Sequence, residues 1–282
     1  MVAKEKNITK AANALNITQP TLSRQLSQLE DELGKQLFIR GKRQIQLTEE
    51  GILLKRRAEE IVSLVNKTHQ EITKGEEMVG QITIGTGIFN SSQTFLIKAI
   101  EQFNQKYPLV TFDIYTGNAD LIKERVDQGL VDIGFVLDPV DVSSYNYLRL
   151  PIFEQWGIIT SINNKLVNNK YILKDDLNNS NIFIANRDMI KSEIFNWLKN
   201  DNYNISYTYN FVSAILPLIK DNKGVAVAVK GAYDVLNNGG ITFLPFYPEI
   251  KTTTSIIWKK HIPLSSIVNQ FIKQLQKNIE ER

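Results

Sequence analysis

Residues 16–30 read "NITQPTLSRQLSQLE" and place a proline beside a strongly amphipathic pattern. Four leucines recur at intervals of four, three and four residues: Leu22, Leu26, Leu29 and Leu33. At about 3.6 residues per turn they form one narrow apolar stripe of an α-helix. Pro20 fits the first turn, where its missing N–H has no helical partner to lose, and Thr18 can cap the free N–H groups. Gly34 then ends the predicted helix.

The side of this helix opposite the leucines is polar. With about 100° between successive side chains, it carries Arg24, Ser27 and Gln28. Gln19 and Thr21 lie at its exposed amino end, and the helix has no acid before Glu30. This end is therefore rich in hydrogen-bonding groups and free of negative charge.

A second helix is predicted just upstream, within residues 7–20, "NITKAANALNITQP". Thr9 is its expected cap, and Asn16 and Ile17 form the turn that follows it. Its small-residue face consists of Ala11, Ala12 and Leu15. Because small alanines let another helix cross closely, the two helices together predict a helix-turn-helix.

Downstream, residues 33–51 read "LGKQLFIRGKRQIQLTEEG" and predict a β-hairpin wing. Two short strands, at residues 38–40 and 44–47, flank Gly41 and the residue after it. The wing carries three cations: Arg40, Lys42 and Arg43. A helix-turn-helix with a basic wing is suited to DNA, since the second helix enters the major groove and the cations meet phosphates.

Composition excludes several classes of protein. A chain of 282 residues with 43% hydrophobic residues predicts two or three domains with ordinary packed cores. The absence of cysteine excludes disulfides, thiolate metal sites and cysteine nucleophiles. With no apolar run long enough for a membrane span and no export signal, we expect a cytoplasmic protein without a membrane partner.

Charge is distributed unevenly along the chain. Residues 1–57 contain eleven Lys or Arg against six Asp or Glu, whereas the remainder contains 22 against 24. Chance scatter is one explanation of this asymmetry. The other, which agrees with the predicted wing, is a basic N-terminal module attached to a near-neutral body.

Residues 8–51 resemble the N-terminal signature of LysR-type transcriptional regulators. The shared features are an Ala-Ala pair, a Gln-Pro helix start, a Leu-Glu-x-x-Leu-Gly helix end and a Leu-Phe-x-Arg wing, in this order and spacing. The match has no gap, and the rest of the chain is also similar to this family. The resemblance implies a sequence-specific DNA-binding transcriptional regulator with a winged helix-turn-helix, a long linker helix and a sensor domain.

Carried over residue by residue, the resemblance implies which side chains face DNA. Gln19, Pro20, Thr21, Ser23 and Arg24 are the expected contacts of the second helix. Among them, the guanidinium of Arg24 can bind the edge of guanine in the major groove, and the carboxamide of Gln19 can bind the edge of adenine. Backbone-positioning contacts are expected from Thr9, Arg40, Lys42 and Arg43. For Arg40 a structural ion pair with the acidic residues 30–32 remains an alternative.

The family also has a full first helix before the helix-turn-helix. Here "MVAKEKN", residues 1–7, supplies only Val2 and Ala3 as apolar contacts for that helix. The resemblance implies an N-terminus shortened within this first helix. We therefore expect either that translation begins upstream of Met1 or that this form binds DNA weakly, because lost core side chains destabilise a small domain.

A long helix is predicted after the wing. Thr48 precedes two acids, which suit the first turn of a helix. Its apolar positions alternate at four and three residues: Leu54, Ala58, Ile61, Val65, Thr68 and Ile72. This heptad pattern favours pairing with a second copy, although packing on the chain's own body is the competing interpretation. A homodimer or homotetramer would place two recognition helices on one side of DNA, which predicts an imperfect inverted repeat as the target.

The remaining two-thirds has the pattern of an α/β domain. Strands are predicted at residues 82–85, 110–117, 131–137, 156–160, 181–185, 224–229 and 252–258. Helices are predicted at residues 91–107, 118–129, 191–200 and 213–221. This alternation favours a parallel sheet covered by helices on both faces. The resemblance implies a type 2 periplasmic-binding-protein-like sensor with two subdomains.

Four loops at the expected carboxyl ends of the strands predict a cleft for a small-molecule effector. The candidate residues are Thr86, Ser91, Ser92, Thr116, Asn118, Arg187 and Ser213. Most are also helix-cap types, so each could simply satisfy its own helix. Arg187 is the fixed cation of the set and could pair with a carboxylate. The Gly-Thr-Gly at residues 85–87 only loosely resembles a phosphate-binding loop.

Catalysis is not expected. His69 and His261 are the only histidines and lack metal-ligand spacing, so no metal site and no cofactor are predicted. Neither a GxSxG nor a Walker sequence occurs. The alternative to a regulator is a solute-binding protein without a DNA-binding role, which would need an export signal but no recognition helix.

The predicted organisation has three parts. Residues 1–48 form the DNA-binding domain, residues 49–79 the linker helix and hinge, and residues 80–282 the effector-binding domain. Within the last, residues 80–150 and 243–282 form one subdomain and residues 151–242 the other. Effector binding is expected to change the relation of the two subdomains and so DNA binding, with RNA polymerase as the further partner.

Overall fold

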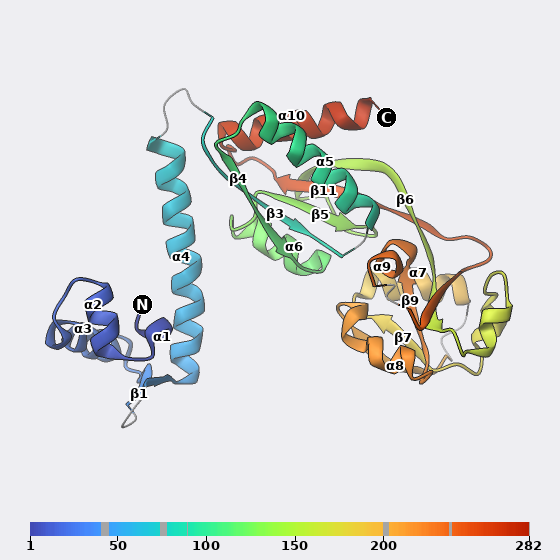
Figure 1. The fold of residues 1–282 in the computed structure, drawn as a ribbon, viewed down its shortest axis with the longest axis horizontal. Coiled ribbons are helices and arrows are strands. Elements are labelled where there is room, and N and C mark those ends of the chain that lie inside the picture. Colours follow the sequence, from blue (N-terminus) through green and yellow to red (C-terminus); the bar gives the residue numbers. More distant parts are fainter. Residues whose placement is uncertain (41–44, 74–77, 89, 200–202, 237–238, 282) are drawn as a thin grey trace. The chain divides into compact units, whose positions relative to one another are not determined.

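A computed structural model describes the chain apart from residues 41–44, 74–77, 89, 200–202, 237–238 and 282. It divides into two units, Met1–Thr73 and Lys74–Arg282 (Figure 1). The helices of the first unit are α1 (Val2–Glu5), α2 (Ile8–Ala14), α3 (Gln19–Leu33) and α4 (Glu49–Thr73). Its strands β1 (Phe38–Arg40) and β2 (Ile45–Leu47) pair antiparallel, as expected for the wing.

The two central helices pack through small side chains. Ala11 and Ala12 of α2 are fully buried against Leu22 of α3. Leu15 was expected on the same face but is 43% exposed, because it lies beyond the end of α2, at its C-cap. Thr9 was expected to cap α2. The cap is Asn7 instead, whose side chain accepts a hydrogen bond from the N–H of Lys10.

The ends of α3 follow the sequence prediction. Thr18 is the N-cap and accepts from the N–H of Thr21, and Pro20 lies in the first turn. Gly34 ends the helix in the left-handed conformation, with φ of 63°. The leucine stripe is buried only at its start, since Leu33 is 48% exposed at its end.

In the second unit, the first lobe contains three parallel strands. These are β3 (Gly80–Thr86), β4 (Val110–Thr116) and β5 (Ile133–Leu137), with β3 in the middle. Helices α5 (Asn90–Lys106) and α10 (Ser266–Glu280) pack together on one core, which contains Phe103 and Phe271. Helix α6 (Ala119–Asp127) packs on a separate cluster around Ile122. The lobe is thus a sheet with helices on both faces.

The second lobe repeats this plan. Strands β7 (Ile182–Ala185), β8 (Ile205–Tyr209) and β9 (Val225–Val229) are parallel, with β7 in the middle. The helices are α7 (Asp188–Leu198), α8 (Leu216–Lys220), α9 (Lys230–Leu236) and three short 3-10 turns, η1 (Lys165–Asn168), η2 (Lys174–Leu177) and η3 (Val212–Ile215). The helix predicted at residues 213–221 is divided into η3 and α8, because Pro217 lacks an N–H and fits only a helix start.

Two long strands connect the lobes. The first part of β6 (Tyr145–Ser161) pairs with β11 (Lys251–Lys259), and its last part pairs with β9 and with β10 (Ile241–Pro245). Chain return to the first lobe was expected from about Phe243, but Phe243 still pairs with Ile159 of the second lobe. The return occurs at β11, whose antiparallel pairing with β5 completes the first lobe.

Candidate functional site

The amino end of α3 presents a fixed set of polar groups. The Nε2 of Gln19 donates to the Oγ of Ser23 at 2.8 Å, and the hydroxyls of Thr18 and Thr21 lie 2.8 Å apart. Gln19, Thr21 and Arg24 are exposed, whereas Ser23 is half-buried. This end of α3 has the positive end of the helix dipole and the side-chain donors and acceptors that suit a major groove.

The other residues predicted to contact DNA lie around α3. Thr9 and Pro20 are exposed, Thr9 in the first turn of α2 and Pro20 in that of α3. Arg40 ends β1. Lys42 and Arg43 lie outside the described residues.

Glu30 anchors the base of the wing. Its Oε1 accepts hydrogen bonds from the N–H groups of Leu37 at 2.7 Å and Phe38 at 3.1 Å. The alternative for Arg40 invoked an ion pair with residues 30–32. The side chain of Arg40 lies outside the described residues, so this ion pair stays an alternative. Glu30 binds the backbone that leads into β1, and so it fixes the wing to α3.

Helix α4 exposes large apolar side chains along its middle. The hydroxyl of Thr48 accepts from the N–H of Gly51 at 3.0 Å and caps this helix, as expected. Ile61 is 63% exposed and Val65 is 60% exposed, and both belong to the predicted heptad stripe. Such a row of exposed apolar side chains is the surface that a coiled-coil partner buries.

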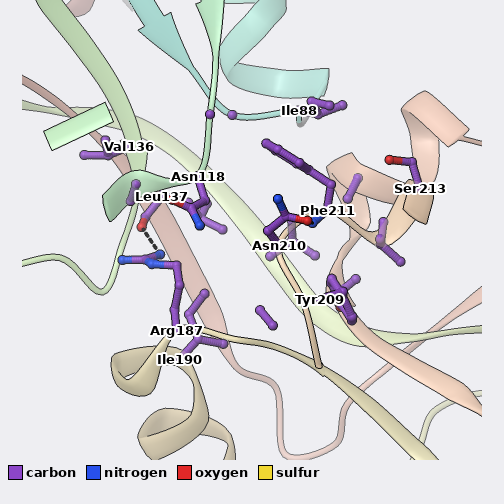
Figure 2. A pocket seen from close by; sticks show the side chains of 18 of the residues that line it. Ile88, Asn118, Val136, Leu137, Arg187, Ile190, Tyr209, Asn210, Phe211 and Ser213 are labelled. Atoms are coloured by element: carbon purple, nitrogen blue, oxygen red, sulfur yellow. Dashed lines mark hydrogen bonds between the residues drawn. The ribbon is translucent and has the colours of Figure 1, made fainter. Parts of the chain in front are cut away.

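A cavity of about 110 Å³ lies between the two lobes of the second unit. Loops after β3, β4, β7 and β8 line it together with the last residues of β5, which agrees with the sequence rule that selected strand ends. Figure 2 shows its side chains, and most are apolar, among them Ile88, Val136, Ile190 and Phe211. The site is therefore a largely apolar chamber with a few polar groups.

Arg187 joins the lobes at the edge of this cavity. It follows β7, and its side chain is 7% exposed. Its Nη1 donates to the carbonyl of Leu137 at 3.2 Å (Figure 2). Its Nη2 donates to the carbonyl of Pro139 at 2.9 Å. Burial lowers the pKa of the guanidinium, and the charge of Asp120 opposes this shift. Arg187 was predicted to pair with a ligand carboxylate. In the structure, hydrogen bonds to the other lobe occupy both of its terminal nitrogens.

Three of the seven predicted effector residues line the cavity: Asn118, Arg187 and Ser213. Asn118 caps α6 by accepting from the N–H of Leu121 at 2.9 Å, so its oxygen has the structural role that was the alternative. The other four do not line it. Thr86 and Ser92 are buried, Thr116 is exposed, and Ser91 donates to Glu154.

Glu154 is a buried carboxylate that the sequence did not single out. It lies on β6 and is 4% exposed. Besides Ser91 at the start of α5, it accepts from the N–H of Gly231 in α9 at 2.9 Å. A Cβ at position 231 would meet this carboxylate, which would then have to shift, so glycine lets the backbone of α9 approach Glu154 closely. Glu154 therefore joins the starts of two helices from different lobes.

A pair of carboxylates lies beside the Arg187 contacts. Asp138 follows β5 and accepts from the Oγ of Ser255 at 3.0 Å, and Arg149 approaches to 3.7 Å. Burial raises the pKa of Asp138. Burial also raises the pKa of Glu193 on α7, and the charge of Asp138 adds to that shift.

Several cavity residues were missed from sequence. Trp156 lies in a strand that was predicted, and Tyr209 ends a strand, β8, that was not. Neither residue is a helix-cap type or carries a charge. Tyr209 is buried, which raises the pKa of its hydroxyl, and that hydroxyl donates to the carbonyl of Val227. The sequence signal that could have found Tyr209 is its place at the end of β8, immediately before the 211–213 loop.

Within the described residues there is no group of three or more His, Asp or Glu that could hold a metal ion. No described helix is long and apolar enough to cross a membrane.

Each of the two units matches a known protein-family model. Residues 1–52 match the bacterial regulatory helix-turn-helix protein family of the LysR type, and residues 75–280 match the LysR substrate binding domain. The chain belongs to the LysR family. Its mixed α/β fold, with a winged helix-turn-helix and a two-lobed domain, agrees with the fold class expected from the sequence.

Relatives in the LysR family include regulators from Bacillus subtilis strain 168. The HTH-type transcriptional regulator BsdA is 36% identical over 133 residues, which are 46% of this chain and 45% of BsdA. The uncharacterized regulator YvbU is 29% identical over 65% of this chain and 62% of its own length. The regulator CzcR is 25% identical over 92% of this chain and 88% of its own. The first two alignments thus span less than two thirds of those relatives.

Solved LysR-family structures share the fold. CbnR matches with a TM-score of 0.71 at 18% identity over 99% of this chain and 96% of its own. CbnR in complex with its target DNA matches with a TM-score of 0.72 at 18% identity over 98% and 96%. At these identities the likeness concerns the fold alone.

Proposed function

We propose that this LysR-family protein is a sequence-specific DNA-binding transcriptional regulator, whose DNA binding or activation is modulated by a small molecule bound between the two lobes. The observation that carries the proposal is the exposed polar end of α3, capped by Thr18 and attached to a wing. A solute-binding protein without a DNA-binding role would have no use for this unit.

In this proposal α3 enters the major groove. Arg24 and Gln19 read base edges, with Thr21, Ser23 and Pro20 beside them. Phosphate contacts come from Thr9, Arg40, Lys42 and Arg43 and give affinity that falls with salt.

The regulator acts as a homodimer or homotetramer through α4. Burying side chains such as Ile61 and Val65 against a second copy removes apolar surface from water and stabilises the pair. Two recognition helices then require an imperfect inverted repeat in the DNA. We assign residues 1–48 to DNA binding and 49–79 to the linker, and we expect RNA polymerase as the further partner in the cytoplasm.

The effector-binding domain, residues 80–282, holds its ligand in the cavity beside Asn118, Arg187 and Ser213. Arg187 of the second lobe binds the first lobe, and Glu154 binds groups of both lobes. A ligand that alters these contacts therefore changes how the lobes meet. No cofactor and no catalytic step are part of the proposal.

Selection of duplexes from a random DNA pool by the full chain tests the proposal. We expect enrichment of one motif with two related half-sites about one helical turn apart or a multiple of that spacing. The Arg24→Ala chain, run in parallel, should not enrich that motif. A pool that stays random after selection with a folded wild-type chain would contradict the regulator assignment.

A further inference from the structure

Two polar side chains at the start of α3 are bonded to each other one helical turn apart. The Nε2 of Gln19 donates to the Oγ of Ser23 at 2.8 Å. Gln19 is exposed and Ser23 is half-buried, so the serine lies nearer to the body of the helix. Polar pairs at this spacing add only slightly to helix stability. The main effect to expect from the bond is therefore on the orientation of the Gln19 side chain.

The bond to Ser23 fixes the two ends of the Gln19 amide. The last torsion of a glutamine side chain is soft, so an unbonded amide readily exchanges the positions of its oxygen and nitrogen. Here the nitrogen faces the Oγ of Ser23, and the exchange would break that hydrogen bond. An amide nitrogen carries two hydrogens. Among the described residues, its second hydrogen and the Oε1 have no partner, which leaves one donor and one acceptor for a base.

One donor beside one acceptor matches the major-groove edge of adenine. Adenine presents its N6 amino group as a donor and its N7 as an acceptor, and an amide binds both at once. Guanine presents two acceptors, N7 and O6, so the Oε1 of Gln19 would face an oxygen. An unbonded amide could turn its nitrogen toward guanine instead. With the amide held by Ser23, this turn costs a hydrogen bond, and guanine is rejected more strongly.

The neighbouring side chains are also held before DNA arrives. The hydroxyls of Thr18 and Thr21 lie 2.8 Å apart, and the Thr18 hydroxyl accepts from the N–H of Thr21 as the helix cap. Side chains that are already ordered lose less conformational entropy when they bind. The start of α3 is thus preorganised, and the Gln19–Ser23 bond is the part of this arrangement that acts on a base-reading group.

We propose that Ser23 is a positioning residue, which holds the Gln19 amide in the orientation that distinguishes adenine from guanine. This inference rests on the proposed function, since it concerns base reading by the same helix. Ser23 then contributes to specificity through Gln19 and needs no base contact of its own.

Competition binding with the full chain tests this role. The probes are the duplex selected from the random pool and its single-base variants. Gln19→Ala identifies the base pair that Gln19 reads, because the preference there is lost. Ser23→Ala should lower the preference for adenine over guanine at that same base pair about threefold or more, and it should leave the preferences at other positions unchanged.

Three further variants separate positioning from other roles. Ser23→Thr keeps the hydroxyl and should restore the preference for adenine. Ser27→Ala is the matched control, because Ser27 is an exposed serine one turn further along the same helix and should leave this preference unchanged. The double variant Gln19→Ala/Ser23→Ala should be as selective as Gln19→Ala alone, since Ser23 acts only through Gln19.

The outcomes distinguish this inference from the proposed function. Equal weakening of all duplexes by Ser23→Ala would assign the serine to a phosphate or to helix stability and overturn the positioning role. Additive losses in the double variant would overturn it too, as would a Gln19 position that does not prefer adenine. In each of these cases the regulator assignment stands, because the wild-type chain still selects a motif. A wild-type chain that selects no motif would contradict both.

Discussion

The guanidinium of Arg187, on the loop before α7, donates a hydrogen bond at 3.2 Å to the carbonyl oxygen of Leu137, at the end of β5. The two residues belong to different lobes, and the bond lies at the edge of the cavity between them. A second bond at 2.9 Å reaches the carbonyl of Pro139. One side chain thus holds the two lobes together and lines the proposed ligand site.

Arg187→Gln should lower the free energy of unfolding by about 1–3 kcal/mol, because buried hydrogen bonds from a charged donor are lost. Urea denaturation of the full chain measures the change. Lys191→Gln is the control, since Lys191 pairs with a 95% exposed Asp188 and its loss should change stability by less than about 0.5 kcal/mol. Basal DNA binding should persist in Arg187→Gln, and equal stabilities of the two variants would refute the structural role.

Arg24→Ala should remove about 1–3 kcal/mol of discrimination between the selected DNA site and random DNA. Gel-shift titration of both duplexes gives this number, with Lys170→Ala in the other unit as the control. Equal loss on both duplexes would instead assign Arg24 to a phosphate.

Lys42→Ala should weaken binding to selected and random DNA alike and flatten its dependence on salt, because a phosphate contact carries no sequence information. Titrations at several salt concentrations measure the slope. A loss confined to the selected duplex would speak against this assignment.

Ile61→Glu in α4 should shift the chain from dimer to monomer by placing a charge on the exposed apolar row. Sedimentation velocity at micromolar concentration measures the shift. Glu59→Gln, on the same helix at a side chain that is 66% exposed, should leave the dimer intact. A dimer unaffected by Ile61→Glu would place the contact on another surface.

Stability should depend on pH through Glu193. Its pKa is raised in the folded protein, so its ionised form is penalised at neutral pH, and the penalty disappears as the pH falls below the unfolded value of about 4.3. Glu193→Gln, which is always neutral, should therefore have a higher Tm than the wild type at pH 7. The two Tm values should converge near pH 4.

Glu101→Gln, at an exposed position, is the control for this pH dependence and should match the wild type throughout. A Glu193→Gln advantage that is the same at both pH values would show that packing, rather than charge, is its cause.

The local pattern of the sequence was sufficient for the elements that depend on local chemistry. The caps at Thr18 and Thr48 and the end at Gly34 follow from side-chain type and spacing alone. Thr9 failed as a cap because Asn7 offers the same chemistry two residues earlier. The edge strand β8 and strand β10 were not predicted, since their stability depends on partners far along the chain.

The cleft was only partly predictable for the same reason. Strand-end loops were found correctly, but the sequence cannot tell which polar residue turns into the cavity and which binds its own lobe. Ser91 binds Glu154, 63 residues away, and Trp156 lines the cavity from within a strand. Both facts depend on the crossing of β6 between the lobes.

Fluorescence anisotropy of the full chain on its selected duplex and on a shuffled duplex, at one fixed salt concentration, tests the central claim most directly. We predict binding at least about 10³-fold tighter to the selected duplex. We also predict that Arg24→Ala reduces this ratio by about tenfold or more. Equal affinity of the wild-type chain for the two duplexes would contradict the assignment of this protein as a sequence-specific regulator.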